Sequence, residues 1–173
     1  GKYVFESDVT FDDGNVANLI FGAQSYETTE NSFVFKLDRN NRNETKIFYF
    51  SGAQKYPLIA GSNGKEFPMG RDSYHMKVVV DGNQCTGYVD GTAVCTGRLP
   101  DYYMEGYLGL GAAEGSAAHF QNTQVSELDT SGWITDLTDV TAVGCYLEYD
   151  ENGIRMNAEG ESYLISGVNM GAD

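Results

Sequence analysis

The sequence predicts an all-β fold, an antiparallel β-sandwich, on three observations. Apolar and polar residues alternate with a period of two through most of the chain, as in strands that bury one face. Turn signals recur about every 8–12 residues, which is typical of sandwiches and barrels. The composition has 12 Tyr, 9 Phe and 21 Gly but only 3 Pro, which suits many strands joined by tight turns. A chain of 173 residues is long enough for one domain with a single core.

The first strand is predicted at residues 2–11, where alternation runs up to the turn Asp12–Asn15. Residues 16–23 are almost continuously apolar, which predicts a strand in the middle of a sheet. Alternation then marks further short strands at 32–37, 46–50, 73–80, 83–89, 92–96, 106–111 and 117–126. No segment has a convincing period of 3.6 residues, so helix is expected only as a short turn near Asp101 or within 133–141.

Two Asp-Gly corners predict a three-stranded meander over residues 74–95. Asp81-Gly82 and Asp90-Gly91 each stand between β-forming residues, and this is the strongest local signal for a hairpin. The two hairpins share their middle strand, so the three strands should lie side by side in one sheet.

The three cysteines are expected to be small buried thiols. A two-residue turn at Asp90-Gly91 would place Cys85 opposite Thr96 and would turn Cys95 to the other face of the sheet. A disulfide between Cys85 and Cys95 is therefore not expected. The third cysteine, Cys145, leaves an odd number, which does not describe a closed disulfide framework.

The formal net charge is −14 and the isoelectric point is near 4.3. Such a surface repels nucleic-acid phosphates and anionic lipids, so neither is an expected partner. The same surface suits solubility and neutral ligands such as sugars. No apolar run approaches the length of a transmembrane span, so membrane insertion is not expected.

Four sequence runs between residues 74 and 125 together form a recognisable family pattern. They are YHMKVVVDGN, GYVDG, GYLGLG and AHFQNTQV. Together with the opening strand, LIFGA at 19–23 and FKLDR at 35–39, these runs resemble the concanavalin A-like, laminin-G-like sandwich. Within it they are most similar to the fructan-binding family 66 carbohydrate-binding modules appended to family 32 glycoside hydrolases of the levanase and inulinase type. The resemblance implies a jelly-roll β-sandwich, as in the concanavalin A-like lectins and glucanases, over residues 1–127.

The tail of the chain extends this resemblance. Residues 144–173, with SYLIS at 162–166, resemble the segment that comes before the first strand in the family, and short strands are expected at 145–149, 153–156 and 162–165. They complete the same sandwich as permuted strands or begin a following repeat. We favour the first alternative, because a half-repeat would expose sheet edges. The Thr- and Asp-rich segment 128–143 is expected to be a strap or linker.

Ligand contacts are expected in loops that carry carboxylates, Arg or aromatic rings. The resemblance implies an aspartate at Asp101, a polar or acidic residue at Glu114, and a strand end of the type Leu-Asp-Arg at Arg39. The expected ligand-binding residues are Asp101, Tyr103, Glu114, Arg39 and Gln24. The chain departs from the family at Gly22, where an arginine is frequent, and at Ala113, where an aromatic residue is frequent.

The resemblance implies a non-catalytic module, secreted or at a bacterial cell surface, that binds polysaccharide or oligosaccharide such as a fructan. A glycoside hydrolase would then be covalently linked to it. The alternative is an adhesion or spacer repeat of a surface protein, linked to further repeats and without sugar binding. No catalytic residue is expected, because Arg71-Asp72 is followed by Ser73 rather than by the Pro of family 32, and no Glu-Cys pair occurs.

No cofactor is expected, because no zinc, P-loop or dinucleotide motif occurs. A structural calcium ion is the one open alternative, since calcium binds carboxylate and carbonyl oxygens. Its candidate ligands are Asp12, Asp13 and Asn15, or Asp150, Glu151 and Asn152. Ordinary Asp/Asn turn chemistry explains both clusters more simply.

Overall fold

The computed structural model describes residues 1–28, 30–51, 54–57, 66–100, 106–113, 115–128, 133–134, 140–150 and 153–170. Side chains are described for 1–28, 30–50, 66–100, 106–113 and 115–128. The elements in chain order are β1 (Lys2–Asp13), β2 (Val16–Ala23), β3 (Ser32–Asp38), the 3-10 helix η1 (Arg42–Glu44), β4 (Lys46–Ser51), β5 (Gln54–Pro57), β6 (Ser73–Asp81), β7 (Gln84–Val89), β8 (Thr92–Arg98), β9 (Gly106–Ala112), β10 (Ala117–Glu127), β11 (Trp133–Ile134), β12 (Val140–Asp150) and β13 (Gly153–Met170).

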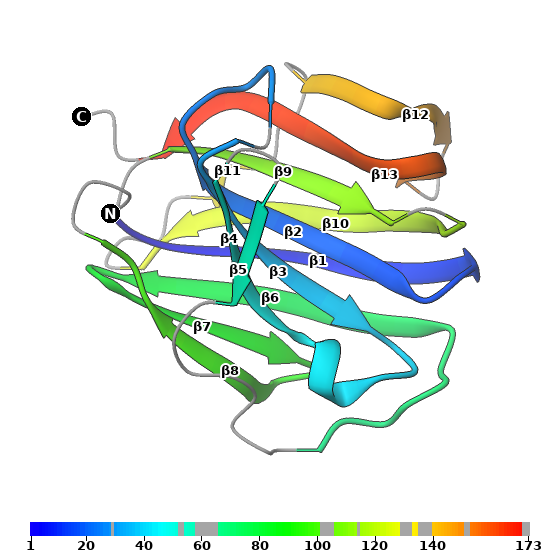
Figure 1. Cartoon of the computed structure of the whole chain (residues 1–173), viewed down its shortest axis with the longest axis horizontal. Coiled ribbons are helices and arrows are strands. Elements are labelled where there is room, and N and C mark those ends of the chain that lie inside the picture. The colour runs from blue at the N-terminus through cyan, green and yellow to red at the C-terminus, as the bar shows by residue number, and fades with distance from the viewer. Residues whose placement is uncertain are drawn as a thin grey trace.

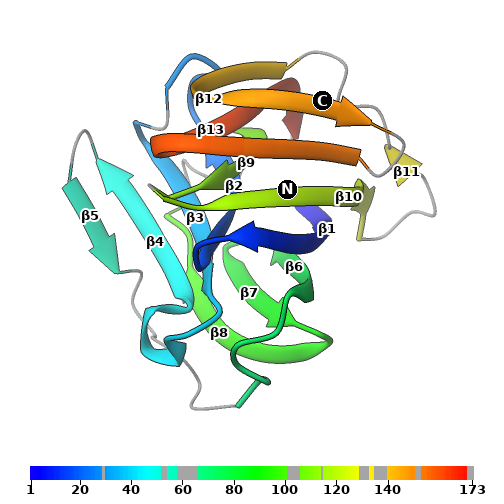
Figure 2. The ribbon, with the colours of Figure 1, turned by 90° about the vertical axis from the view of Figure 1, so that its right-hand side faces the viewer.

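The strands form an antiparallel β-sandwich, which confirms the predicted fold class (Figures 1 and 2). One layer has the order β5-β4-β3-β2-β9 and the other has the order β10-β1-β6-β7-β8. The long strand β13 connects the two layers, because it pairs with β9 through residues 162–170 and with β10 through residues 154–157. In the described part of the tail, β13 thus pairs with strands from residues 1–127 in the same sheet.

The core lies between the layers and follows from the alternation in the sequence. In β1 the odd-numbered residues from Tyr3 to Phe11 are buried, while the even-numbered ones face outward. β3 supplies Phe33, Phe35 and Leu37 from the opposite layer, and all three are fully buried. Burying side chains of this size is the main favourable contribution to folding.

The register of β7 and β8 corrects the prediction made for Cys95. A bulge between Gly87 and Tyr88 shifts the pairing, so that Cys85 lies opposite Gly97 and Cys95 lies opposite Gly87. Both thiols therefore face the core, and both are free. The prediction assumed an uninterrupted hairpin after a two-residue turn. A bulge adds one residue to a strand, so every residue beyond it faces the opposite side of the sheet from the one predicted.

The only helix in the described part of the chain is η1, and it lies where no helix was predicted. No helix among the described residues is long and apolar enough to span a membrane. Asn41 begins η1 by accepting a hydrogen bond from the backbone N–H of Asn43, at 3.1 Å. Thr45 ends it, and its hydroxyl accepts a hydrogen bond from the backbone N–H of Asp38, at 2.9 Å. This local capping fixes the position of Glu44.

Candidate functional site

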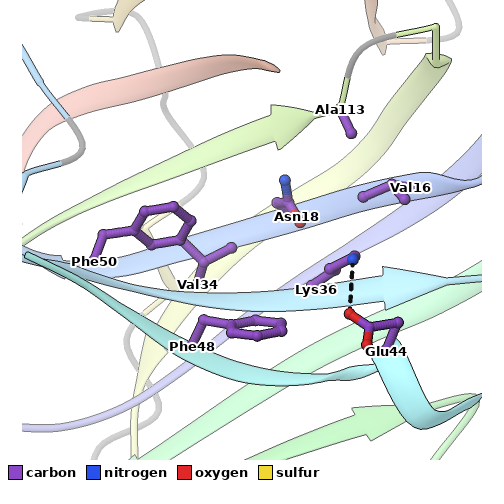
Figure 3. Close-up of a pocket in the computed structure, with 8 residues that line it drawn as sticks. All are labelled: Val16, Asn18, Val34, Lys36, Glu44, Phe48, Phe50 and Ala113. Carbon is purple, nitrogen blue, oxygen red and sulfur yellow. Dashed lines mark hydrogen bonds and ion pairs between the residues drawn. The ribbon is translucent and has the colours of Figure 1, made fainter. Parts of the chain in front are cut away.

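The outer face of the β4-β3-β2-β9 layer carries a pocket of about 180 Å³ (Figure 3). We call it the outer-face pocket, and it is lined by Val16, Asn18, Val34, Lys36, Glu44, Phe48, Phe50 and Ala113. Its volume is below the roughly 300 Å³ at which pockets for drug-sized ligands begin, so it suits one small ring rather than an extended ligand.

Two aromatic rings form one side of the pocket. Phe48 and Phe50 are two residues apart on β4, so their side chains lie on the same face of the sheet. Ile47, directly before Phe48, points to the other face and is buried in the core. Both rings are only partly buried. The pocket therefore presents the apolar surface of two rings.

An ion-pair cluster forms the polar end of the pocket. Lys36 Nζ lies 3.3 Å from one carboxylate oxygen of Glu44, and Lys46 Nζ lies 3.6 Å from the other. The hydrogen bond from Lys36 is the main reason that the pKa of Glu44 lies below its usual value. Both ammonium groups also stand over the Phe48 ring, at 5.8 Å and 5.2 Å from its centroid. Glu44 is thus held ionised beside an aromatic ring.

A comparison with solved structures matches the chain to the carbohydrate binding module CBM66 from Bacillus subtilis. The TM-score is 0.60 and the sequence identity is 23%, over 73% of this chain and 75% of that chain. The chain has a CBM66-like fold. The fold implied by the resemblance in the sequence is confirmed, whereas a shared fold does not identify the ligand. No protein-family model and no curated protein matches the chain.

The two residues of the predicted ligand set whose side chains the structure describes, Gln24 and Arg39, lie far apart. Gln24 follows the C-terminal end of β2, where its backbone N–H bonds Asn31 O at 3.2 Å. Arg39 follows β3 at the other end of the pair, where its backbone N–H bonds Asn15 O at 3.0 Å. The eight residues of β2 separate them, which is about 26 Å at 3.3 Å per residue. They cannot contact one sugar ring, and Asp101, Tyr103 and Glu114 lie outside the described residues.

Arg39 makes contacts that hold loops together. Its Nε donates to Gly14 O at 2.9 Å, and its Nη1 donates to Arg71 O at 3.2 Å and to Asp72 Oδ1 at 3.1 Å. The guanidinium also stacks 4.9 Å from the centroid of the Phe11 ring. Arg39 therefore joins the β1–β2 turn to the segment before β6.

The Asp/Asn turn proposed as a calcium site makes hydrogen bonds within the protein. Asp13 Oδ1 accepts from the backbone N–H of Gly14 at 2.8 Å, and Asn15 Oδ1 accepts from Asn40 at 2.7 Å. Asp12 Oδ2 lies 2.9 Å from His119 Nδ1. Where side chains are described, no group of three or more His, Cys, Asp or Glu residues is arranged to hold a metal ion.

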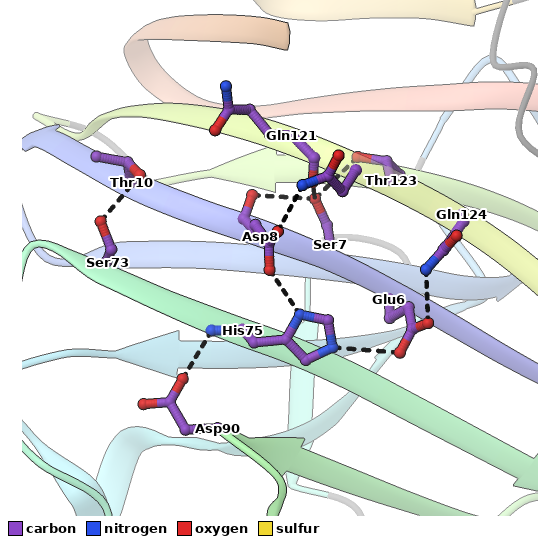
Figure 4. Close-up of polar contacts among 11 residues, drawn as sticks. Glu6, Ser7, Asp8, Thr10, Ser73, His75, Asp90, Gln121, Thr123 and Gln124 are labelled. Atoms are coloured by element: carbon purple, nitrogen blue, oxygen red, sulfur yellow. Dashed lines mark hydrogen bonds and ion pairs between the residues drawn. The ribbon is translucent and has the colours of Figure 1, made fainter. Parts of the chain in front are cut away.

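A second polar cluster lies on the outer face of the other layer (Figure 4). His75 Nδ1 is 2.7 Å from Asp8 Oδ1, and His75 Nε2 is 3.2 Å from Glu6 Oε2. The remaining carboxylate oxygens accept from Asn122 and Gln124, each at 2.8 Å. Both ring nitrogens of His75 face carboxylates, so neither is available to activate a hydroxyl. This cluster joins β10, β1 and β6 and does not form a nucleophile-base pair.

A bulge in β10 aims Asn122 at this cluster. Glu6 pairs with Gln124 but Asp8 pairs with Gln121, so β10 holds one extra residue. Asn122 adopts φ 51°, a conformation that asparagine tolerates better than most residues. Burial raises the pKa of Asp8, but the hydrogen bonds from Asn122 and His75 outweigh it and hold that pKa below its usual value.

Proposed function

We propose that the chain is a non-catalytic carbohydrate-binding module that holds one sugar ring in the outer-face pocket. The observation that carries this proposal is the pair of partly buried rings, Phe48 and Phe50, beside polar side chains on a CBM66-like fold. An aromatic ring offers apolar area to the C–H face of a sugar, and the polar groups bond its hydroxyls.

The charges of the pocket favour a neutral sugar. Glu44 accepts hydrogen bonds and is ionised, so it suits hydroxyl donors and repels a carboxylate or sulfate. Lys36 and Lys46 are both paired with Glu44. The net charge of −14 disfavours anionic polymers over the whole surface.

A fructan is the first ligand to test, because the sequence resembles fructan-binding modules, and the likeness to CBM66 supports a carbohydrate ligand. In this proposal the module belongs to a secreted or cell-surface protein and targets a linked glycoside hydrolase to polysaccharide. Tethering raises the local concentration of the linked domain, so weak binding to a single ring is sufficient.

Affinity gel electrophoresis in levan, inulin and a panel of neutral polysaccharides tests the proposal. The wild-type chain should be retarded in at least one of these gels. The double variant Phe48→Ala/Phe50→Ala should bind at least about tenfold more weakly, the equivalent of roughly 1.4 kcal/mol.

Tyr88→Ala is the matched control. Tyr88 is a partly buried ring on the outer face of the other layer, and Lys77 Nζ stands 4.7 Å from its centroid, much as Lys46 stands over Phe48. This variant should bind like the wild type. A wild-type chain that no glycan retards would refute the proposal and would favour the adhesion or spacer repeat instead.

A further inference from the structure

Among the buried polar side chains that the structure describes, Asn18 stands out because one of its polar atoms lacks a hydrogen-bond partner. It lies in the middle of β2, between Lys36 on β3 and Gly111 on β9, and only 8% of its surface is exposed. Its Oδ1 atom has no hydrogen-bond partner among the described residues. The buried hydroxyls of Ser7, Thr45 and Ser116 all have partners.

The fold alone does not explain an asparagine at this position. Asparagine is disfavoured in strands, and a buried polar atom without a partner costs stability. The neighbours Leu19 and Ile20 show that β2 otherwise buries apolar side chains. A leucine of similar size would fit the strand without that cost.

The place of Asn18 in the wall of the outer-face pocket offers an explanation for an asparagine at this position. The Asn18 side chain rises from β2 among Val16, Val34 and Lys36 and lines the pocket (Figure 3). Lys36 and Glu44 are bonded to each other, so Asn18 is the polar lining residue that is not already paired within the pocket.

We infer that Asn18 determines the specificity of the outer-face pocket by donating a hydrogen bond from its amide nitrogen to a hydroxyl of the sugar ring that packs on Phe48 and Phe50. This inference rests on the proposed function. The amide nitrogen has two N–H donors and a sugar hydroxyl oxygen accepts hydrogen bonds, so the pair is complementary for a neutral sugar. The cost of the unpaired Oδ1 atom is then the cost of keeping an amide that binds ligand, since an unsatisfied buried polar group in a native structure calls for such an explanation.

The test compares Asn18→Leu with the wild type in two independent measurements. The first is thermal and urea unfolding without ligand, and the second is affinity electrophoresis in levan and inulin. Asn18→Leu should unfold at the same or a higher temperature than the wild type, and it should bind about five- to tenfold more weakly. Ile20→Val is the control, because Ile20 is buried on the same strand but does not line the pocket. It should leave binding unchanged.

Three results would overturn the inference, and they can be told apart. If Asn18→Leu is clearly less stable than the wild type, Asn18 serves the fold. If the wild type binds and Asn18→Leu binds equally well, the pocket still binds sugar but Asn18 does not select it. If the wild type binds neither fructan, the fructan proposal fails and the inference about Asn18 fails with it.

Discussion

Replacing Gly87 by alanine tests how closely the two layers of the sandwich pack. Gly87 lies on β7, and it faces Phe35 from β3 in the opposite layer. A Cβ atom at Gly87 would lie 2.6 Å from Phe35 Cε2 and 2.8 Å from Cys95 Sγ. Phe35 and Cys95 are completely buried, so neither can move into solvent. The added methyl group must therefore force the layers or these side chains apart.

The size of the effect follows from these distances. Carbon atoms in contact are normally about 3.5–4.0 Å apart, so the methyl group would overlap Phe35 by roughly 1 Å. Overpacking of this kind costs about 1–3 kcal/mol. In a domain of this size each kcal/mol lowers the Tm by roughly 2–4 °C, so the Tm should fall by about 2–12 °C.

Urea unfolding and thermal melts measure this change. Thr96→Ala is the control, because Thr96 lies on the outer face of the neighbouring strand β8 and should change stability by about 0.5 kcal/mol at most. Adding Phe35→Leu should recover part of the stability lost in Gly87→Ala, with a coupling energy of about 0.5–3 kcal/mol. A Gly87→Ala variant as stable as the wild type, or strictly additive effects, would refute the packing described here.

Two further predictions concern titratable groups. Hydrogen bonds lower the pKa of Asp8, so Asp8 adds stability that is complete above its unfolded value of about 3.9 and is lost as the pH falls through the folded value. Asp8→Asn should therefore lose less stability between neutral pH and about pH 3, and equal losses in urea midpoints would contradict this. Burial raises the pKa of both Cys85 and Cys95 to about 12. In a Cys145→Ser background, both thiols should react with a disulfide reagent only as fast as the protein opens, and immediate reaction of the folded protein would contradict their burial.

Most of the fold could be predicted because its signals are local. Alternation in β1 and the corners at Asp81-Gly82 and Asp90-Gly91 place strands within a few residues of their observed ends. The register of Cys95 could not be predicted, because it depends on a bulge after Gly87 that no local turn signal marks. The length of β13 also depends on partners far away in the sequence, namely β9 and β10.

The sequence did not predict the outer-face pocket, because its residues lie on strands and not in the loops where ligand contacts were expected. Asn18, Lys36 and Phe48 come from three different strands and meet only when β2, β3 and β4 pair. In the sequence they are ordinary outward positions of alternating strands. The available signal was the spacing of Phe48 and Phe50, two aromatic residues on the outward face of one strand.

The central claim is that a sugar ring binds on the outer face of the β4-β3-β2-β9 layer. It is tested most directly by backbone NMR of the labelled protein titrated with levan-derived oligosaccharides. The largest shifts should appear at Asn18, Lys36, Phe48 and Phe50, while His75 and Tyr88 on the other layer should not move. Shifts confined to the loop around Arg39 or to the face around His75 would contradict the claim.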